Sequence, residues 1–87
     1  MFEKPLDMMM IEWMDSCGTT EGWEYKDEIE PIVPTRCISV GFVLDSTPEY
    51  ITLLQNDSEM QVLGRMAIPT CSVMETWNLE KIERPEL

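Results

Sequence analysis

The sequence contains no histidine and only six lysine and arginine residues, against seventeen aspartate and glutamate residues, so its formal net charge is −11 at pH 7. Without histidine, the chain has no imidazole to act as a general base or a metal ligand. The shortage of cations excludes the basic surface that binds a nucleic-acid backbone. No apolar run reaches 18 residues, and the first residues lack a basic region, so we expect neither a membrane span nor a secretion signal.

The 87 residues are enough for one small domain, and 44% of them are hydrophobic, which is too many for a disordered acidic chain. A core of this size is marginal, so self-association would be a natural supplement. The three cysteines are Cys17, Cys37 and Cys71, an odd and widely spaced set. We expect free thiols in a reducing cytosol, buried as small hydrophobic side chains.

Five segments show the alternation of apolar and polar residues that is typical of half-buried strands. They cover residues 8–15, 35–44, 49–55, 59–68 and 70–77. In the first, Met9, Ile11 and Trp13 share one face. Short turns are expected at 45–48 and 56–58, where proline and small polar residues gather. The connection between the first two strands is much longer, and a loop of that length is often functional.

These segments predict an all-β domain, a small five-stranded antiparallel barrel of SH3-like or Sm-like type with a long loop after the first strand. Residues 1–87 form one domain, with the barrel over about 8–78 and a charged tail at 79–87. The segment 68–73 resembles the tight turn that joins the last two strands of SH3-like barrels. Gly41, inside a strand, suggests a bend or a close backbone approach. An OB-like barrel is the alternative.

The long loop, residues 16–34, is the strongest candidate for a binding site. Trp13 and Trp23 bracket a stretch of short polar residues, so the loop could offer aromatic faces for stacking and hydroxyls for hydrogen bonds. Alternatively, Trp13 belongs to the core and Trp23 plugs the open end of the barrel. One or two helical turns fit within residues 23–29.

Enzymatic chemistry and metal binding are not expected. Ser16 and Cys17 follow Asp15, but no base of suitable pKa accompanies them, so the chain is not expected to be an enzyme. Acidic residues cluster at 27–30 without the alternate spacing and central glycine of an EF-hand loop. We therefore expect no metal and no cofactor.

An ordered set of short segments resembles a widespread family of small phage-encoded proteins, over about residues 9–76. The matching segments are Trp13-Met14-Asp15-Ser16, Gly22-Trp23, residues 39–44, residues 50–53 and residues 68–73. Some members of that family are similar to anti-CBASS sponge proteins. Those are viral proteins that oligomerise and sequester the cyclic dinucleotide signals of bacterial antiphage defence.

The resemblance implies a homo-oligomer in the cytoplasm of an infected bacterial host that binds a small nucleotide, with a cyclic dinucleotide suspected, and does not cleave it. Aromatic side chains would stack on bases, cations would face phosphates, and hydroxyls would meet base edges. The ligand-binding candidates are Trp13, Ser16, Trp23, Tyr25, Arg36, Arg65, Thr70 and Ser72. No membrane and no nucleic-acid backbone is expected as a partner.

The acidity itself supports a competing hypothesis, because a dianionic ligand is repelled by a chain of charge −11. A small acidic protein can mimic DNA and inhibit a restriction enzyme or another DNA-binding protein. The acids concentrate in the long loop and near the tail. They are Glu21, Glu24, Asp27, Glu28 and Glu30, then Glu75, Glu80, Glu83 and Glu86. A third possibility is a non-enzymatic phage assembly or interaction module.

Overall fold

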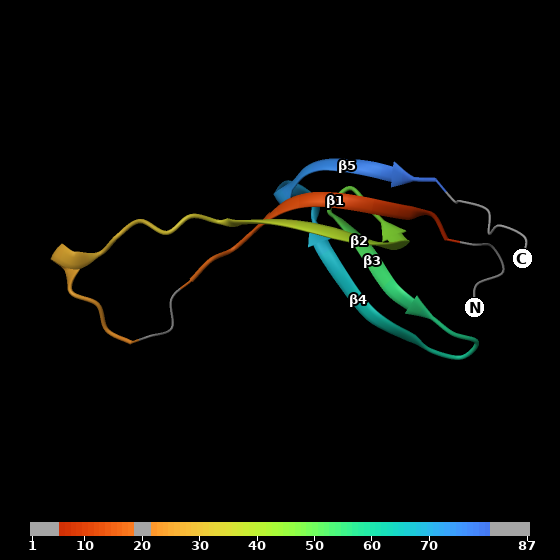
Figure 1. The fold of residues 1–87 in the computed structure, drawn as a ribbon, viewed down its shortest axis with the longest axis horizontal. Coiled ribbons are helices and arrows are strands. Elements are labelled where there is room, and N and C mark those ends of the chain that lie inside the picture. Colours follow the sequence, from red (N-terminus) through yellow and green to blue (C-terminus); the bar gives the residue numbers. More distant parts are fainter. Residues whose placement is uncertain (1–5, 19–21, 81–87) are drawn as a thin grey trace, which may run out of the picture.

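The computed structural model describes residues 6–18 and 22–80, which form five strands and two short 3-10 helices (Figure 1). In chain order these are β1 (Met8–Asp15), η1 (Lys26–Glu28), β2 (Thr35–Ser46), β3 (Tyr50–Asp57), β4 (Val62–Pro69), η2 (Thr70–Ser72) and β5 (Val73–Leu79). Of the predicted charged tail, residues 81–87 lie outside the described part of the chain, as do Glu21, Glu83 and Glu86.

The strands form one sheet in the order β4-β3-β2-β1-β5, and every neighbouring pair is antiparallel. This confirms the prediction of an all-β, five-stranded antiparallel protein. Among the described residues, no pairing joins β4 to β5, so the sheet is not closed. The predicted barrel is therefore not confirmed.

The first strand has the predicted bounds, and the others shift by a few residues. β2 continues two residues beyond the prediction because its ladder with β3 resumes after a register shift between Val43 and Asp45. β4 begins three residues later than predicted. Ser58 accounts for this, since its amide donates to the Gln61 carbonyl at 2.9 Å and its Oγ accepts from the Gln61 amide at 3.1 Å, closing a turn.

A tight helical turn joins the last two strands, as predicted. It is η2, and the Thr70 amide donates to the Glu49 carbonyl at 2.9 Å, which holds this turn against the start of β3. The other helical turn, η1, lies within residues 23–29, where one was expected.

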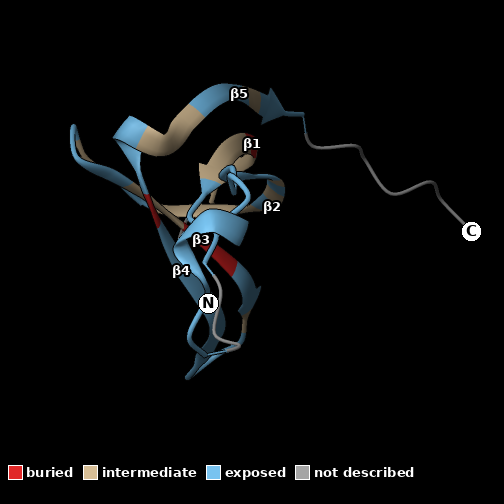
Figure 2. Ribbon diagram, turned by 90° about the vertical axis from the view of Figure 1, so that its left-hand side faces the viewer, coloured by how far each residue is buried: buried red, intermediate tan, exposed pale blue. Residues whose placement is uncertain are grey.

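The core is very small and lies on one face of the bent sheet (Figure 2). In the described part of the chain only Ile11, Leu53, Leu54 and Ile68 are buried. Three of them contact one another, surrounded by half-buried side chains that include Met9 and Trp13, as the alternation in β1 predicts. Exposure differs among the strands in Figure 2: β4 is exposed at every residue except Ile68, whereas β1 is mostly half-buried.

The opposite face of β5, β1 and β2, here called the outer face, is also largely apolar. Directly opposed residues of paired strands share a face, so the register groups one set of side chains there. The set is Met8, Met10, Ile38, Val40, Phe42, Trp77 and Leu79. All seven are exposed or half-buried. The same register also places Glu12, its ion-pair partner Arg36, and Glu75 on this face, nearer the arm. The outer face is therefore an apolar set of side chains with charged residues at one end, and the described residues leave the apolar set partly open to solvent.

Residues 16–18 and 22–34, here called the arm, project away from the sheet between β1 and β2 (Figure 1). The molecule measures 63 × 33 × 27 Å, and its radius of gyration is 17.9 Å, whereas a compact chain of this length has about 12 Å. Trp23 is fully exposed on the arm, so it does not plug an end of the sheet.

The three cysteines are free thiols, as expected, but the prediction that they are buried is wrong. Cys17 and Cys71 are exposed, because one lies on the arm and the other in η2, and Cys37 is half-buried. In the part of the chain that the structure describes, no helix is long and apolar enough to cross a membrane.

Candidate functional site

The predicted ligand-binding residues fall into three separate places: the base of the arm, the arm itself, and the side of the sheet formed by β3 and β4. Trp13, Ser16 and Arg36 lie at the base of the arm, where β1 ends and β2 begins. Val73, directly after Ser72, pairs with Trp13, so η2 also lies near this end of the sheet.

Trp13 has a structural role that its environment explains. Its indole N–H donates to Ser39 Oγ at 3.0 Å, across the β1–β2 ladder, and the ring packs against the buried cluster. A half-buried indole whose only N–H donor is already bonded offers little to a ligand. The interpretation of Trp13 as a core residue therefore fits the structure better than a stacking role.

Arg36 is held at the base of the arm by an ion pair with Glu12. Its Nε donates to Glu12 Oε1 at 2.9 Å and its Nη2 donates to Oε2 at 3.0 Å, which is the bidentate geometry that suits a guanidinium and a carboxylate. These hydrogen bonds lower the pKa of the Glu12 carboxyl below its ordinary value of 4.5 and raise the pKa of Arg36. Arg36 keeps further N–H donors, but its charge is already matched by a neighbouring carboxylate.

The Glu12–Arg36 pair predicts a small pH dependence of stability. A carboxyl whose pKa is lowered on folding contributes stability above its unfolded pKa, and this contribution is lost as the pH falls through the lower folded pKa. We expect Glu12→Gln to lower Tm near pH 7 and to lose most of that difference near about pH 3. Thermal unfolding followed by circular dichroism tests this, with Glu49→Gln, an exposed acid in the β2–β3 turn, as the control. If the Tm difference between Glu12→Gln and the wild type were as large near about pH 3 as near pH 7, this prediction would be contradicted.

The arm carries the most accessible aromatic side chains of the predicted set. Trp23 is 105% exposed and Tyr25 is 76% exposed, and both precede η1. Lys26, the first residue of η1, adds an exposed cation directly after Tyr25. Sequence reasoning did not include Lys26, although its position beside Tyr25 was the available signal. Ser16 lies at the start of the arm, where its backbone amide donates a hydrogen bond to the Asp15 carboxylate oxygen Oδ1 at 2.8 Å.

The remaining predicted residues do not join this group within one chain. Arg65 is in β4, opposite Leu54, with β3 and β2 between it and β1. Thr70 and Ser72 belong to η2, the first exposed and the second half-buried. A single copy therefore does not assemble the eight predicted residues into one pocket.

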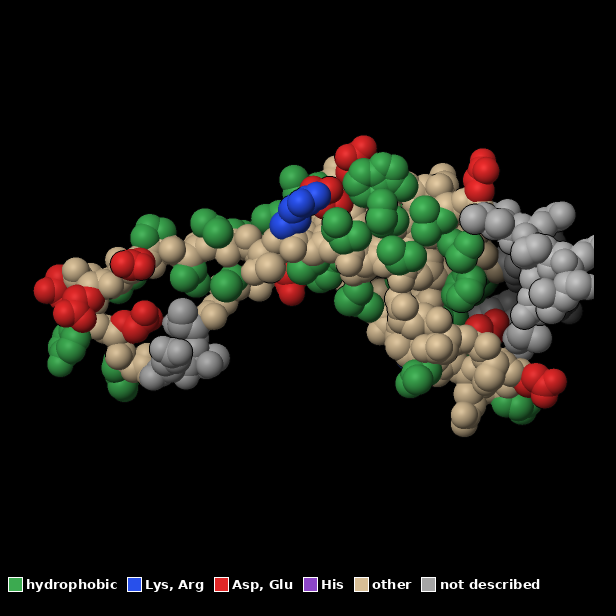
Figure 3. Space-filling view, in the orientation of Figure 1, with side chains coloured by type: hydrophobic (Ala, Val, Ile, Leu, Met, Phe, Trp, Pro, Cys, Tyr) green, Lys and Arg blue, Asp and Glu red, His purple; other side chains and the backbone are tan. Residues whose placement is uncertain are grey.

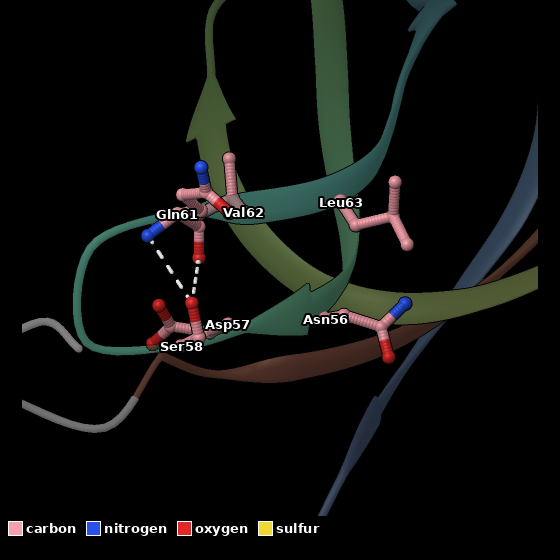
Figure 4. A pocket seen from close by; sticks show the side chains of 6 residues that line it. All are labelled: Asn56, Asp57, Ser58, Gln61, Val62 and Leu63. Atoms are coloured by element: carbon pink, nitrogen blue, oxygen red, sulfur yellow. Dashed lines mark hydrogen bonds between the residues drawn. The ribbon is translucent and has the colours of Figure 1, made fainter.

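An open hollow of about 580 Å³ lies at the far end of the β3–β4 hairpin (Figure 4). It is lined by Asn56, Asp57, Ser58, Gln61, Val62 and Leu63. The Ser58 and Gln61 side of this hollow is the hydrogen-bonded turn itself, as the dashed lines in Figure 4 show. Its lining contains a single carboxylate and no cation, and none of the predicted ligand-binding residues belongs to it.

Comparison with known proteins finds no family model, no curated protein and no solved structure that matches this chain. Within residues 6–18 and 22–80, no three cysteine, aspartate or glutamate side chains converge in a way that could hold a metal ion. The surface that the structure leaves most available for binding is thus the arm, with Trp23, Tyr25 and Lys26.

Proposed function

We propose that this protein binds a small nucleotide, a cyclic dinucleotide of bacterial antiphage defence, and sequesters it without cleaving it. The observation that carries the proposal is the exposure of Trp23 and Tyr25 on the arm, beside Lys26. Exposed aromatic rings are the surfaces on which bases stack, and an adjacent ammonium group can meet a phosphate. In this proposal the protein acts in the cytoplasm of an infected bacterium and self-associates.

The proposal places binding on the arm. Arg36, at the arm's base, is the second cation close to this segment, while Arg65 lies in β4, with β3 between it and β2. A two-fold assembly would bring two arms to one two-fold ligand, each contributing an aromatic pair and a lysine. Thr70 and Ser72, in η2 near the base of the arm, remain candidates for hydrogen bonds to base edges.

We also propose that the sheet belongs to the SH3-like or Sm-like type. Two features support this: the strand order, in which β5 lies beside β1, and the 3-10 turn between the last two strands. In such a fold the long first connection is a surface element, and here that element is the arm.

Replacing Trp23 by alanine tests the nucleotide proposal. Loss of one stacked base should weaken binding by about 1–3 kcal/mol, or about 5- to 150-fold in Kd. Titration calorimetry against a panel of cyclic dinucleotides measures this, with Met60→Ala as the control, because Met60 is 89% exposed at the distant β3–β4 turn. Trp23→Phe should retain much of the affinity. Ligand recovered intact after heating would show binding without turnover.

DNA mimicry is the second candidate, and the arm gives it a specific observation. Four acidic residues lie on the arm, close in sequence to Trp23 and Tyr25. They are Glu24, Asp27, Glu28 and Glu30. Acidic side chains gather at the arm's tip in Figure 3. If no cyclic dinucleotide bound while a basic DNA-binding protein was captured in a salt-sensitive manner, mimicry would replace sequestration.

A further inference from the structure

In the described part of the chain, two apolar surfaces are exposed to solvent. The first is a set of three aliphatic side chains on the returning half of the arm, here called the arm stripe: Ile29, Ile32 and Val33, which are 55–72% exposed. The second is the outer face of β5, β1 and β2. Figure 3 shows hydrophobic side chains both along the arm and gathered over the sheet.

Neither surface is covered by the described part of its own chain. The arm projects away from the sheet (Figure 1), and its returning half continues directly into β2 at Thr35. The core meanwhile contains only four fully buried side chains among the described residues. A domain of this length with so little burial gains most from covering apolar surface on another molecule.

We infer that the arm stripe of one copy packs on the outer face of a second copy, and that two copies exchange this contact around a two-fold axis. Each copy offers one stripe and one face, so a single isologous pairing covers both surfaces of both copies. Three stripe residues and seven outer-face residues give ten apolar residues per copy. That is a suitable apolar centre for an interface with about 20–30 residues a side.

Charge determines how this pairing responds to salt. Each copy has a net charge of −11, so two copies repel each other. The contact joins apolar side chains, and the charged groups on the same face are Glu75 and the Glu12–Arg36 pair, which is already formed within each copy. Since the Debye length falls from about 10 Å at 0.1 M to about 3 Å at 1 M, added salt should tighten the dimer. An association driven by ion pairs would loosen instead.

This inference specifies the self-association that the proposed function includes, and it uses different residues from nucleotide binding. The arm stripe and the outer face make the interface, while Trp23, Tyr25 and Lys26 bind the nucleotide. If the inferred interface is wrong, the mass of the ligand-free protein in solution will show it. If the proposed function is wrong, calorimetry will show no binding of a cyclic dinucleotide. The two failures are therefore distinguishable.

The first experiment is sedimentation equilibrium on the ligand-free protein, whose chain mass is 10.1 kDa. We expect a dimer for the wild type and a monomer for Ile32→Asp/Val33→Asp, with Kd raised about 100-fold or more, since four carboxylates would enter one apolar interface. Met60→Asp/Leu63→Asp adds the same charge at exposed positions near the β3–β4 turn and should remain dimeric. Circular dichroism of each variant verifies the fold.

Mixing two variants tests the pairing of stripe with face. Val40→Asp damages the outer face, and Ile32→Asp/Val33→Asp damages the stripe, so each variant alone loses both contacts of its dimer. A mixture can form one intact contact per pair, with the undamaged stripe of one variant on the undamaged face of the other. We therefore expect the mixture to dimerise more tightly than either variant alone.

Three results would overturn the inference. One is a wild type that sediments as a monomer at about 100 μM in 1 M salt, where the screened repulsion most favours pairing. The second is a stripe variant that dimerises as well as its charge-matched control, which places the interface elsewhere. The third is a mixture no tighter than its components, which excludes the contact of stripe with face.

Discussion

Replacing Leu53 by alanine is expected to destabilise the protein by about 2–5 kcal/mol. Leu53 is fully buried, and its neighbours Val43 in β2 and Met66 in β4 are its ladder partners. Its side chain belongs with Ile11 and Ile68 to a buried cluster that joins β1, β3 and β4. Small domains have about 5–15 kcal/mol of total stability, so the loss would be a large share of it.

Urea unfolding at one fixed protein concentration measures this effect, because self-association makes apparent stability depend on concentration. Leu63→Ala is the matched control: the same substitution on the adjacent strand, at a side chain that is 71% exposed. Leu53→Met, which conserves volume, should cost less than about 1.5 kcal/mol. If Leu53→Ala and Leu63→Ala had equal effects, the buried cluster would not be the source of stability.

Replacing Gly41 by valine is the second large expected effect. A Cβ at this position would lie 3.0 Å from the Leu54 carbonyl oxygen and 3.2 Å from Leu53 Cβ. The Gln55 side chain also closes over the site, since its amide donates to the Val40 carbonyl. Because the nearest atoms include backbone, β3 must move away from β2, and we expect a loss of about 1–3 kcal/mol or more.

Thermal and urea unfolding measure the effect at Gly41, with Gly18→Val as the matched control. A Cβ on Gly18 meets nothing within 4 Å, and its φ is not positive, so the same substitution there should change stability little. Gly41→Ala should fall between the two. A Gly41→Val protein as stable as the Gly18 variant would show that the two strands separate at no cost.

Local patterning predicted most of the fold. The alternation in β1 identified its bounds and its buried face, and the proline and polar residues after β2 marked the turn into β3. The length of β2 was underestimated because a register shift after Val43 lets pairing resume, and no local signal shows such a shift. The predicted closure of the sheet into a barrel is not confirmed, because closure depends on how strands far apart in the sequence meet, and local patterning does not show this.

The candidate site was harder to predict than the fold, for a reason that Trp13 and Trp23 illustrate. Both are tryptophans next to polar residues, yet one packs on the core with its N–H bonded to Ser39 and the other is fully exposed. The difference arises from the strand alternation that includes Trp13 and the projecting arm that includes Trp23. Likewise, Arg36 is committed to Glu12 by a register that places β1 and β2 side by side.

The pairing of Asp15 with Thr35 means that β1 and β2 already meet at the two ends of the arm. In topological terms they form an ordinary β-hairpin whose turn has been expanded. Loop-closure entropy grows only slowly with loop length, by about 0.6 kcal/mol for each doubling. Insertions or grafted peptides between these two residues, placed outside the arm stripe, should therefore leave the pairing of β1 with β2 nearly unaffected. The arm is a modular insertion point, at which binding properties can change while the folding unit stays constant.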